Sequence, residues 1–293
     1  MKNILKKIVT KFNSVSENPT LNYLEDGKIS LNLALKEQNL EDIFQTLSSI
    51  ISDLTNQETD NDYSHPFYQL KVRSHHAFQV KFFLNLLRKF DKKEIIVMDI
   101  GDSAGTHMTY FKTIARGLGF HLKTFSVNLD AAAVEKIRMK GLDAYQCRAE
   151  DIKNVAGVEP DIIVSFQMVE HLHDPCSFLR SIAKYMKTEH IFITVPFLET
   201  SRVGLHSIRK NISGAITAEQ EHIFELNPED WKLLFLHSGW KVLQEEIYYQ
   251  YPLAQKNKYK KMWLEYDYEG FWGVHLYRDL EISDRYTAWG ELQ

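Results

Sequence analysis

Cysteine, long apolar runs and surplus positive charge are scarce or absent in this sequence. Two cysteines, Cys147 and Cys176, occur in 293 residues, which excludes a disulfide scaffold and is typical of a reducing compartment, here predicted to be the cytoplasm. No apolar stretch reaches the ~18 to 20 residues of a transmembrane helix. The 35 Lys and Arg residues are outnumbered by 39 Asp and Glu, giving a net charge of −4, so nucleic acid is not expected as a partner.

The chain divides into regions that differ in composition and hydrophobic pattern. Residues 1–12 place apolar side chains on one helical stripe, which predicts a helix that docks on the protein's own core or, alternatively, lies on a membrane surface. Lysines interrupt this stripe, so it is not a signal peptide. We predict an N-terminal helical extension at 1–65, which ends in a polar loop, and a main domain at 66–293. Within that domain we predict a lid at 197–225 and an aromatic-rich segment at 251–293.

Short β-branched runs alternate with helical stretches in the main domain. This pattern predicts an α/β fold with a doubly wound, Rossmann-like sheet. Strands are expected at 94–100, 122–128, 143–147, 161–166, 190–195, 240–249 and 271–278. Helices are expected at 106–118, 131–140, 176–187 and 228–237. Ligands of such sheets bind beyond the carboxyl ends of the strands, so the residues that follow each strand are the candidates for function.

Two glycines follow the first predicted strand. The run Asp99-Ile-Gly101-Asp-Ser103-Ala-Gly105 leads directly into a helix. Gly101 would let a ligand approach the backbone, and Gly105 would let the helix pack closely on the strand. The turn therefore predicts a cofactor-binding loop.

Polar and aromatic residues follow the next three strands. These candidates are Asn128, Asp130, Glu150, Asp151, Phe166 and Gln167. Because parallel strands end at a common edge, we expect all of them near the glycine turn.

The order of four segments resembles the class I S-adenosylmethionine-dependent methyltransferases, particularly the quinone and small-molecule O-methyltransferases. The segments are the glycine turn, "RAEDI", "DIIVSFQMVEHLHDP" and "HIFITVP", within residues 94–249. The resemblance implies a seven-stranded sheet with its last strand antiparallel and S-adenosyl-L-methionine as the cofactor. It further implies that the glycine turn holds the methionine part, Asn128 faces the ribose, Glu150 and Asp151 lie near the adenine, and Phe166 and Gln167 line the pocket.

The sequence departs from this family at several positions. Ser103 replaces a glycine, and Asn128 replaces the acid that binds the ribose, for which Asp130 is an alternative source of a carboxylate. Quinone-type relatives use acids and a histidine around "EHL" for a divalent metal. Glu170 and His171 match, but Gln167 replaces the preceding acid and is a poorer ligand. We therefore predict no metal.

Methylation of a hydroxyl group requires removal of its proton, for which a histidine is suited. His222 is the first candidate, because it precedes a segment that relatives place over the cofactor, and His171 is the second. Candidate acceptor-binding residues are Arg73, His76, Arg202, His206 and Arg209.

The sequence thus predicts a methyltransferase for a small polar acceptor, such as a sugar, a sugar nucleotide or a surface-glycan precursor. Ser103 and Asn128 leave open a non-catalytic interaction module of the same fold. A nicotinamide-dependent oxidoreductase is the third alternative, although the sequence lacks the G-x-G-x-x-G fingerprint.

Overall fold

The computed structural model describes residues 19–57, 63–155, 157–217 and 220–285. The helix predicted at 1–12 lies outside these residues. Among the described helices, none combines the length and apolar character needed to cross a bilayer.

Strands predicted from short apolar runs form one central sheet. They are β1 (Glu94–Ile100), β2 (His121–Asn128), β3 (Asp143–Gln146), β4 (Ile162–Phe166), β5 (His190–Pro196), β8 (Trp240–Tyr249) and β9 (Gly270–Arg278). In the described part of the chain the sheet has seven strands in the order β3-β2-β1-β4-β5-β9-β8. The first five pair in parallel, and β9 lies antiparallel between β5 and β8. The predicted doubly wound sheet with an antiparallel last strand is confirmed.

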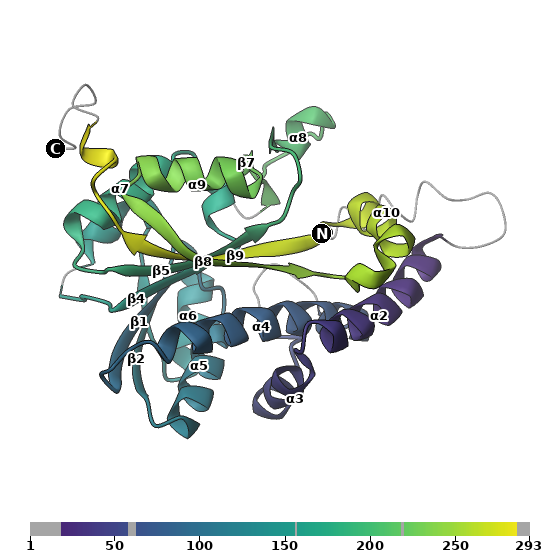
Figure 1. Cartoon of the computed structure of the whole chain (residues 1–293), viewed down its shortest axis with the longest axis horizontal. Coiled ribbons are helices and arrows are strands. Elements are labelled where there is room, and N and C mark those ends of the chain that lie inside the picture. The colour runs from purple at the N-terminus through teal and green to yellow at the C-terminus, as the bar shows by residue number, and fades with distance from the viewer. Residues whose placement is uncertain (1–18, 58–62, 156, 218–219, 286–293) are drawn as a thin grey trace.

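Helices cover both faces of the sheet, as Figure 1 shows. One face carries α4 (Pro66–Leu87), α5 (Thr106–Gly117) and α6 (Ala131–Met139), with α2 (Pro19–Glu37) and α3 (Glu41–Ile50) packed outside α4. The opposite face carries α7 (Pro175–Tyr185) and α9 (Pro228–His237). The short 3₁₀ helices are η1 (Ala149–Asn154), η2 (Val169–His171), η4 (Leu253–Gln255) and η5 (Ser283–Arg285). Because both faces are covered, the central strands read as continuous apolar runs.

The segment predicted as a lid has structure of its own. It contains β6 (Arg202–Val203), α8 (His206–Arg209) and β7 (Phe224–Glu225). The two short strands pair antiparallel in a separate sheet. A Cβ on Gly204 would lie 2.2 Å from the His222 carbonyl oxygen, so glycine is required for this close pairing.

Aromatic residues of the C-terminal segment form a core with the N-terminal helices. The helix α10 (Lys256–Tyr266), which the sequence did not predict, buries Tyr259 and Trp263 against Tyr23 and Phe67. Trp263 also donates from its indole nitrogen to the buried Ser30 hydroxyl at 3.0 Å. These residues therefore pack as core.

Arg73 holds the N-terminal extension to the main domain. Its guanidinium donates to the Ser48 hydroxyl at 2.8 Å and to the carbonyls of Ile51 and Ser52 at 2.9 and 3.0 Å. The side chain was a candidate for binding an anionic ligand. Its contacts instead fasten the end of α3 to α4, so we leave it out of the proposed acceptor site.

Candidate active site

The turn between β1 and α5 is a tight loop in which both predicted glycines are required. Gly101 and Gly105 have φ values of 97° and 71°. A Cβ on Gly101 would lie 2.7 Å from Met168 Cγ, and one on Gly105 would lie 2.6 Å from Leu142 Cδ1. The first contact brings the residues after β4 against this loop, and the second seats the start of α5 on the neighbouring chain.

Asp102, which the sequence analysis did not single out, organises the loop from within. Its buried carboxylate accepts from the amides of Ala104 at 3.1 Å and Gly105 at 2.6 Å, and from the Ser126 hydroxyl at 2.6 Å. Burial raises the pKa of Asp102, and these donors oppose that effect. The neighbouring Asp99 is also buried, and burial raises its pKa well above the ordinary value. The loop is thus shaped around one acidic side chain.

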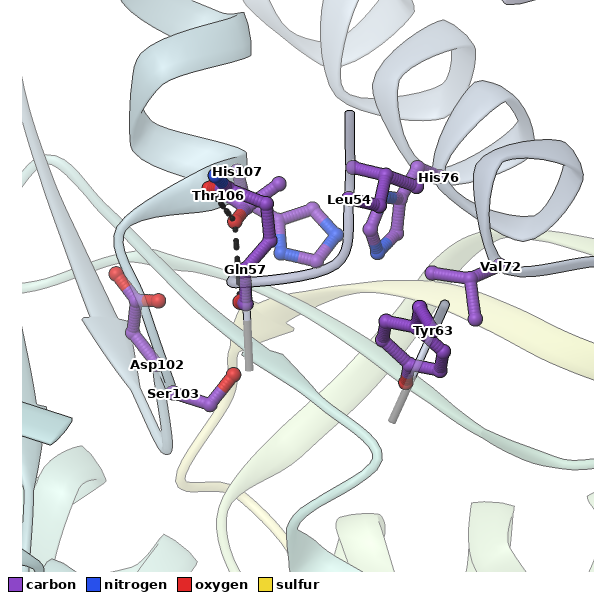
Figure 2. A pocket seen from close by; sticks show the side chains of 9 residues that line it. All are labelled: Leu54, Gln57, Tyr63, Val72, His76, Asp102, Ser103, Thr106 and His107. Atoms are coloured by element: carbon purple, nitrogen blue, oxygen red, sulfur yellow. Dashed lines mark hydrogen bonds between the residues drawn. The ribbon is translucent and has the colours of Figure 1, made fainter. Parts of the chain in front are cut away.

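A small cavity lies beside this loop, and Figure 2 shows the side chains around it. Ser103 lines it from the glycine turn, and His76 lines it from α4. Gln57, from the end of the N-terminal extension, closes one side and accepts a hydrogen bond from the Thr106 hydroxyl at 3.2 Å. The extension therefore covers the predicted cofactor loop.

Three buried histidines on α4 and α5 are held in the neutral form, and two of them, His76 and His107, line the cavity. Burial lowers the pKa of His107 to about 3. Burial also holds the pKa values of His75 and His76 well below the ordinary value. His107 Nε2 lies 2.8 Å from the Gln79 side-chain oxygen. The predicted acceptor-binding residue His76 can therefore offer hydrogen bonds but no charge.

The buried His107 should make the fold sensitive to mild acid. The unfolded chain binds a proton near pH 6.5 and the folded protein does not, so stability falls as pH drops from about 6.5 toward 3. Between pH 7.0 and 5.5, the free energy of unfolding of His107→Gln should fall by about 1 kcal/mol less than that of the wild type. Urea unfolding at the two pH values measures this difference. The control is His121→Gln, which replaces an exposed histidine. Equal pH sensitivity of the wild type and both variants would contradict the conclusion that His107 is held neutral by burial.

The residues after β2 support the loop and the next helix. Asn128 donates from Nδ2 to the Asp102 carbonyl at 3.0 Å and accepts from the Asp130 amide at 2.8 Å. Asp130 caps α6 through the Ala132 amide at 2.9 Å. Both predicted ribose-binding side chains therefore lie beside the loop, each engaged in its local structure.

The predicted residues after β3 and β4 lie along the same edge of the sheet. Glu150 and Asp151 belong to η1 and are at least partly exposed. Phe166 packs 4.6 Å from the His107 ring, centroid to centroid. Gln167 has a φ of 53°, and its side-chain Nε2 donates to the Thr194 hydroxyl at 3.2 Å. Phe166 thus ends β4, and Gln167 directly follows it.

Both predicted catalytic histidines meet a buried carboxyl group just beyond β4. One donor atom from each of Glu170, His171 and His222 lies within 4.8 Å of the others. The Ile223 amide donates to the Glu170 carbonyl at 2.8 Å, which holds the end of the 197–225 segment against η2. The Glu170 side chain is 0% exposed, and its carboxylate has no hydrogen-bond partner among the described residues. We call these three residues the histidine–glutamate cluster.

Glu225 is a second buried carboxylate, and it is saturated with donors. Tyr268 donates to it at 2.5 Å, His222 Nδ1 lies at 3.2 Å, and His206 Nε2 lies at 3.1 Å. Arg202 forms an ion pair with the same group. Burial raises the pKa of Glu225, but these donors outweigh it and hold the pKa far below the ordinary value. Two predicted acceptor-binding residues, Arg202 and His206, are therefore engaged in fixing this segment.

Arg209, the last predicted acceptor-binding residue, also bonds within its own segment. Its guanidinium donates to the carbonyl oxygens of Val203 and Gly204, at distances between 2.7 and 3.1 Å. It therefore shapes the turn between β6 and α8.

Comparison with known proteins identifies the family. A profile described as "Methyltransferase domain" matches residues 73–245. The chain belongs to this methyltransferase family, and its resemblance to class I S-adenosylmethionine-dependent methyltransferases is confirmed at that level. The quinone-type branch stays a prediction. No curated protein matches the sequence.

Solved structures agree with the fold at low sequence identity. An O-methyltransferase from a Brevibacillus brevis trans-AT PKS multienzyme, in complex with S-adenosyl-L-homocysteine, has 12% identity and a TM-score of 0.50, covering 76% of this chain and 82% of its own. Magnesium protoporphyrin IX methyltransferase from Synechocystis PCC 6803, with bound SAM, has 9% identity and a TM-score of 0.50, covering 92% and 100%. At these identities the likeness establishes the fold alone.

Proposed function

We propose that this protein transfers the methyl group of S-adenosyl-L-methionine to a hydroxyl oxygen of a small polar acceptor, such as a sugar, a sugar nucleotide or a surface-glycan precursor. Membership in the methyltransferase family supports the cofactor. The main support for the proposed reaction is that Met168 packs against Gly101, which brings the histidine–glutamate cluster next to the predicted cofactor loop. A methyl donor and a proton acceptor would therefore share one edge of the sheet.

The proposed reaction needs alignment and one proton transfer. The cofactor supplies the methyl group on its sulfonium sulfur. A new bond joins the acceptor oxygen to the methyl carbon, and the electron pair of the broken carbon–sulfur bond stays on sulfur. His222 takes the hydroxyl proton, and His171 is the second candidate for this role. Glu225 orients His222 through Nδ1.

The polarity of this edge supports a polar acceptor. The cavity near the loop is bordered by the neutral imidazoles of His76 and His107 and by the Ser103 side chain. Neutral imidazoles donate and accept hydrogen bonds, as recognition of hydroxyl groups requires.

Calorimetric titration tests the cofactor half of the proposal. We expect saturable binding of S-adenosylmethionine and S-adenosylhomocysteine at one site per chain. Absence of binding at high micromolar ligand would contradict the enzyme proposal and favour a non-catalytic interaction module. In a thermal-shift comparison, stabilisation by NAD and none by S-adenosylhomocysteine would favour the oxidoreductase instead.

A further inference from the structure

The histidine–glutamate cluster has the composition of a metal site. We propose that Glu170, His171 and His222 bind one divalent transition-metal ion, such as Zn²⁺. The sequence predicted no metal, because Gln167 replaces an acid used by quinone-type relatives. In the structure the third donor comes instead from His222, which the fold brings in from before β7. Metal binding does not depend on the proposed methyl transfer.

The buried carboxylate of Glu170 favours a bound cation. A fully buried carboxylate without a hydrogen-bond donor is strongly unfavourable unless it takes up a proton or a cation neutralises it. The nearby Glu225 has Arg202 and several other donors, and Asp267 forms an ion pair with Lys71 at 2.6 Å. Glu170 has no such partner among the described residues. A metal ion would supply the missing positive charge.

The orientation of the two imidazoles also favours a bound metal ion. His171 Nδ1 lies 3.0 Å from the Glu221 carbonyl oxygen, which can only accept, so Nδ1 carries the proton. His222 Nδ1 lies 3.2 Å from the Glu225 carboxylate and 2.8 Å from the Tyr268 hydroxyl, whose own proton goes to Glu225. Both rings therefore keep Nε2 as the basic nitrogen. Metal-binding histidines commonly donate a hydrogen bond from the nitrogen that does not bind the metal to an acceptor of this kind.

The donor set indicates the class of ion. Two imidazole nitrogens and one carboxylate favour a transition ion over Mg²⁺ or Ca²⁺, which prefer oxygen. Donors around Zn²⁺ lie roughly 3 to 3.5 Å apart, so small side-chain rotations would bring atoms now within 4.8 Å onto the ion. Three protein ligands leave one position open, as in catalytic zinc sites. An ion bound to Nε2 of both rings would occupy the nitrogen through which His222 or His171 would act as the base. In the metal-loaded protein, the ion would instead make a hydroxyl bound at the open position release its proton more readily.

Titration of the chelator-treated full-length chain with Co²⁺ tests this site without substrate or cofactor. We expect one Co²⁺ per chain, visible in the absorption spectrum, with Zn²⁺ competing for it. His222→Gln is the primary variant, because this side chain is 20% exposed and its replacement is compatible with folding. His171→Gln and Glu170→Gln are the second and third. Each folded variant should bind Co²⁺ at least about 10-fold more weakly.

The matched control is His173→Gln, an exposed histidine on the same segment as His171. It should bind Co²⁺ like the wild type. The proposal is overturned if the wild type shows no saturation at one Co²⁺ per chain, if Co²⁺ affinity is unchanged in folded His222→Gln, or if Mg²⁺ binds and Co²⁺ does not. Separate titration with S-adenosylmethionine distinguishes failure of the metal site from failure of the proposed function.

Discussion

Replacing Asp102 with alanine is expected to destabilise the protein by about 2 to 3 kcal/mol and to weaken S-adenosylmethionine binding at least about 10-fold. The variant leaves the amides of Ala104 and Gly105 and the Ser126 hydroxyl without their acceptor. Removing a buried carboxylate recovers part of the loss, because burial raises the pKa of Asp102 and so opposes its charged form. Urea unfolding and calorimetry measure the two effects.

The control for Asp102→Ala is Asp174→Ala. Asp174 accepts from the Ser177 amide at 2.9 Å and caps α7 on the opposite face of the sheet. Losing this cap should cost about 1 kcal/mol and leave cofactor affinity unchanged. If Asp102→Ala bound the cofactor as tightly as Asp174→Ala does, the β1–α5 loop would not be the cofactor site.

Replacing His222 with glutamine is expected to lower methyl transfer by about 10²- to 10⁴-fold. Glutamine can keep a hydrogen bond to Glu225 but cannot take up a proton. The variant should fold, and its affinity for S-adenosylmethionine should stay within about threefold of the wild type, because His222 lies beyond β4 and outside the glycine loop. Transfer of labelled methyl groups to a panel of sugars and sugar nucleotides measures the loss.

His173→Gln serves again as the comparison, and it should retain the wild-type rate. Near-normal turnover in His222→Gln would remove His222 from the mechanism and leave His171 as the candidate base. A parallel Co²⁺ titration of the same variant reports whether a metal is lost together with activity.

Local sequence patterns were sufficient to predict most of the sheet and its helices. The strands at 94–100 and 240–249 and the helix at 228–237 have the bounds predicted for them. Apolar β-branched runs fix a buried strand, and Asn227 with Pro228 marks the start of a helix, so each signal acts within a few residues. The helix α10 was missed, although Tyr259, Trp263 and Tyr266 recur at helical spacing, because the surrounding residues are strongly polar.

Candidate site residues were harder to predict than the elements that hold them. Gly101 and Gly105 could be recognised, since a turn between a strand and a helix restricts the backbone locally. Asp102 and Glu225 could not, because their importance comes from donors that are distant along the chain, such as Ser126 and Tyr268. The same reason explains why Arg73 and Arg202 were predicted to face a ligand, since their partners Ser48 and Glu225 are also distant along the chain.

The sequence by itself determined most of the strands and helices along the chain, the glycine loop after β1 and the family. Periodicity, turn residues and short motifs are local properties of the chain. Only the tertiary structure decided which side chains meet. It seated His222 against Glu170 and His171, and it engaged Arg73 with the end of α3. A polar side chain buried by folding must find partners wherever the packed elements place them, and the sequence of its own segment does not specify those partners.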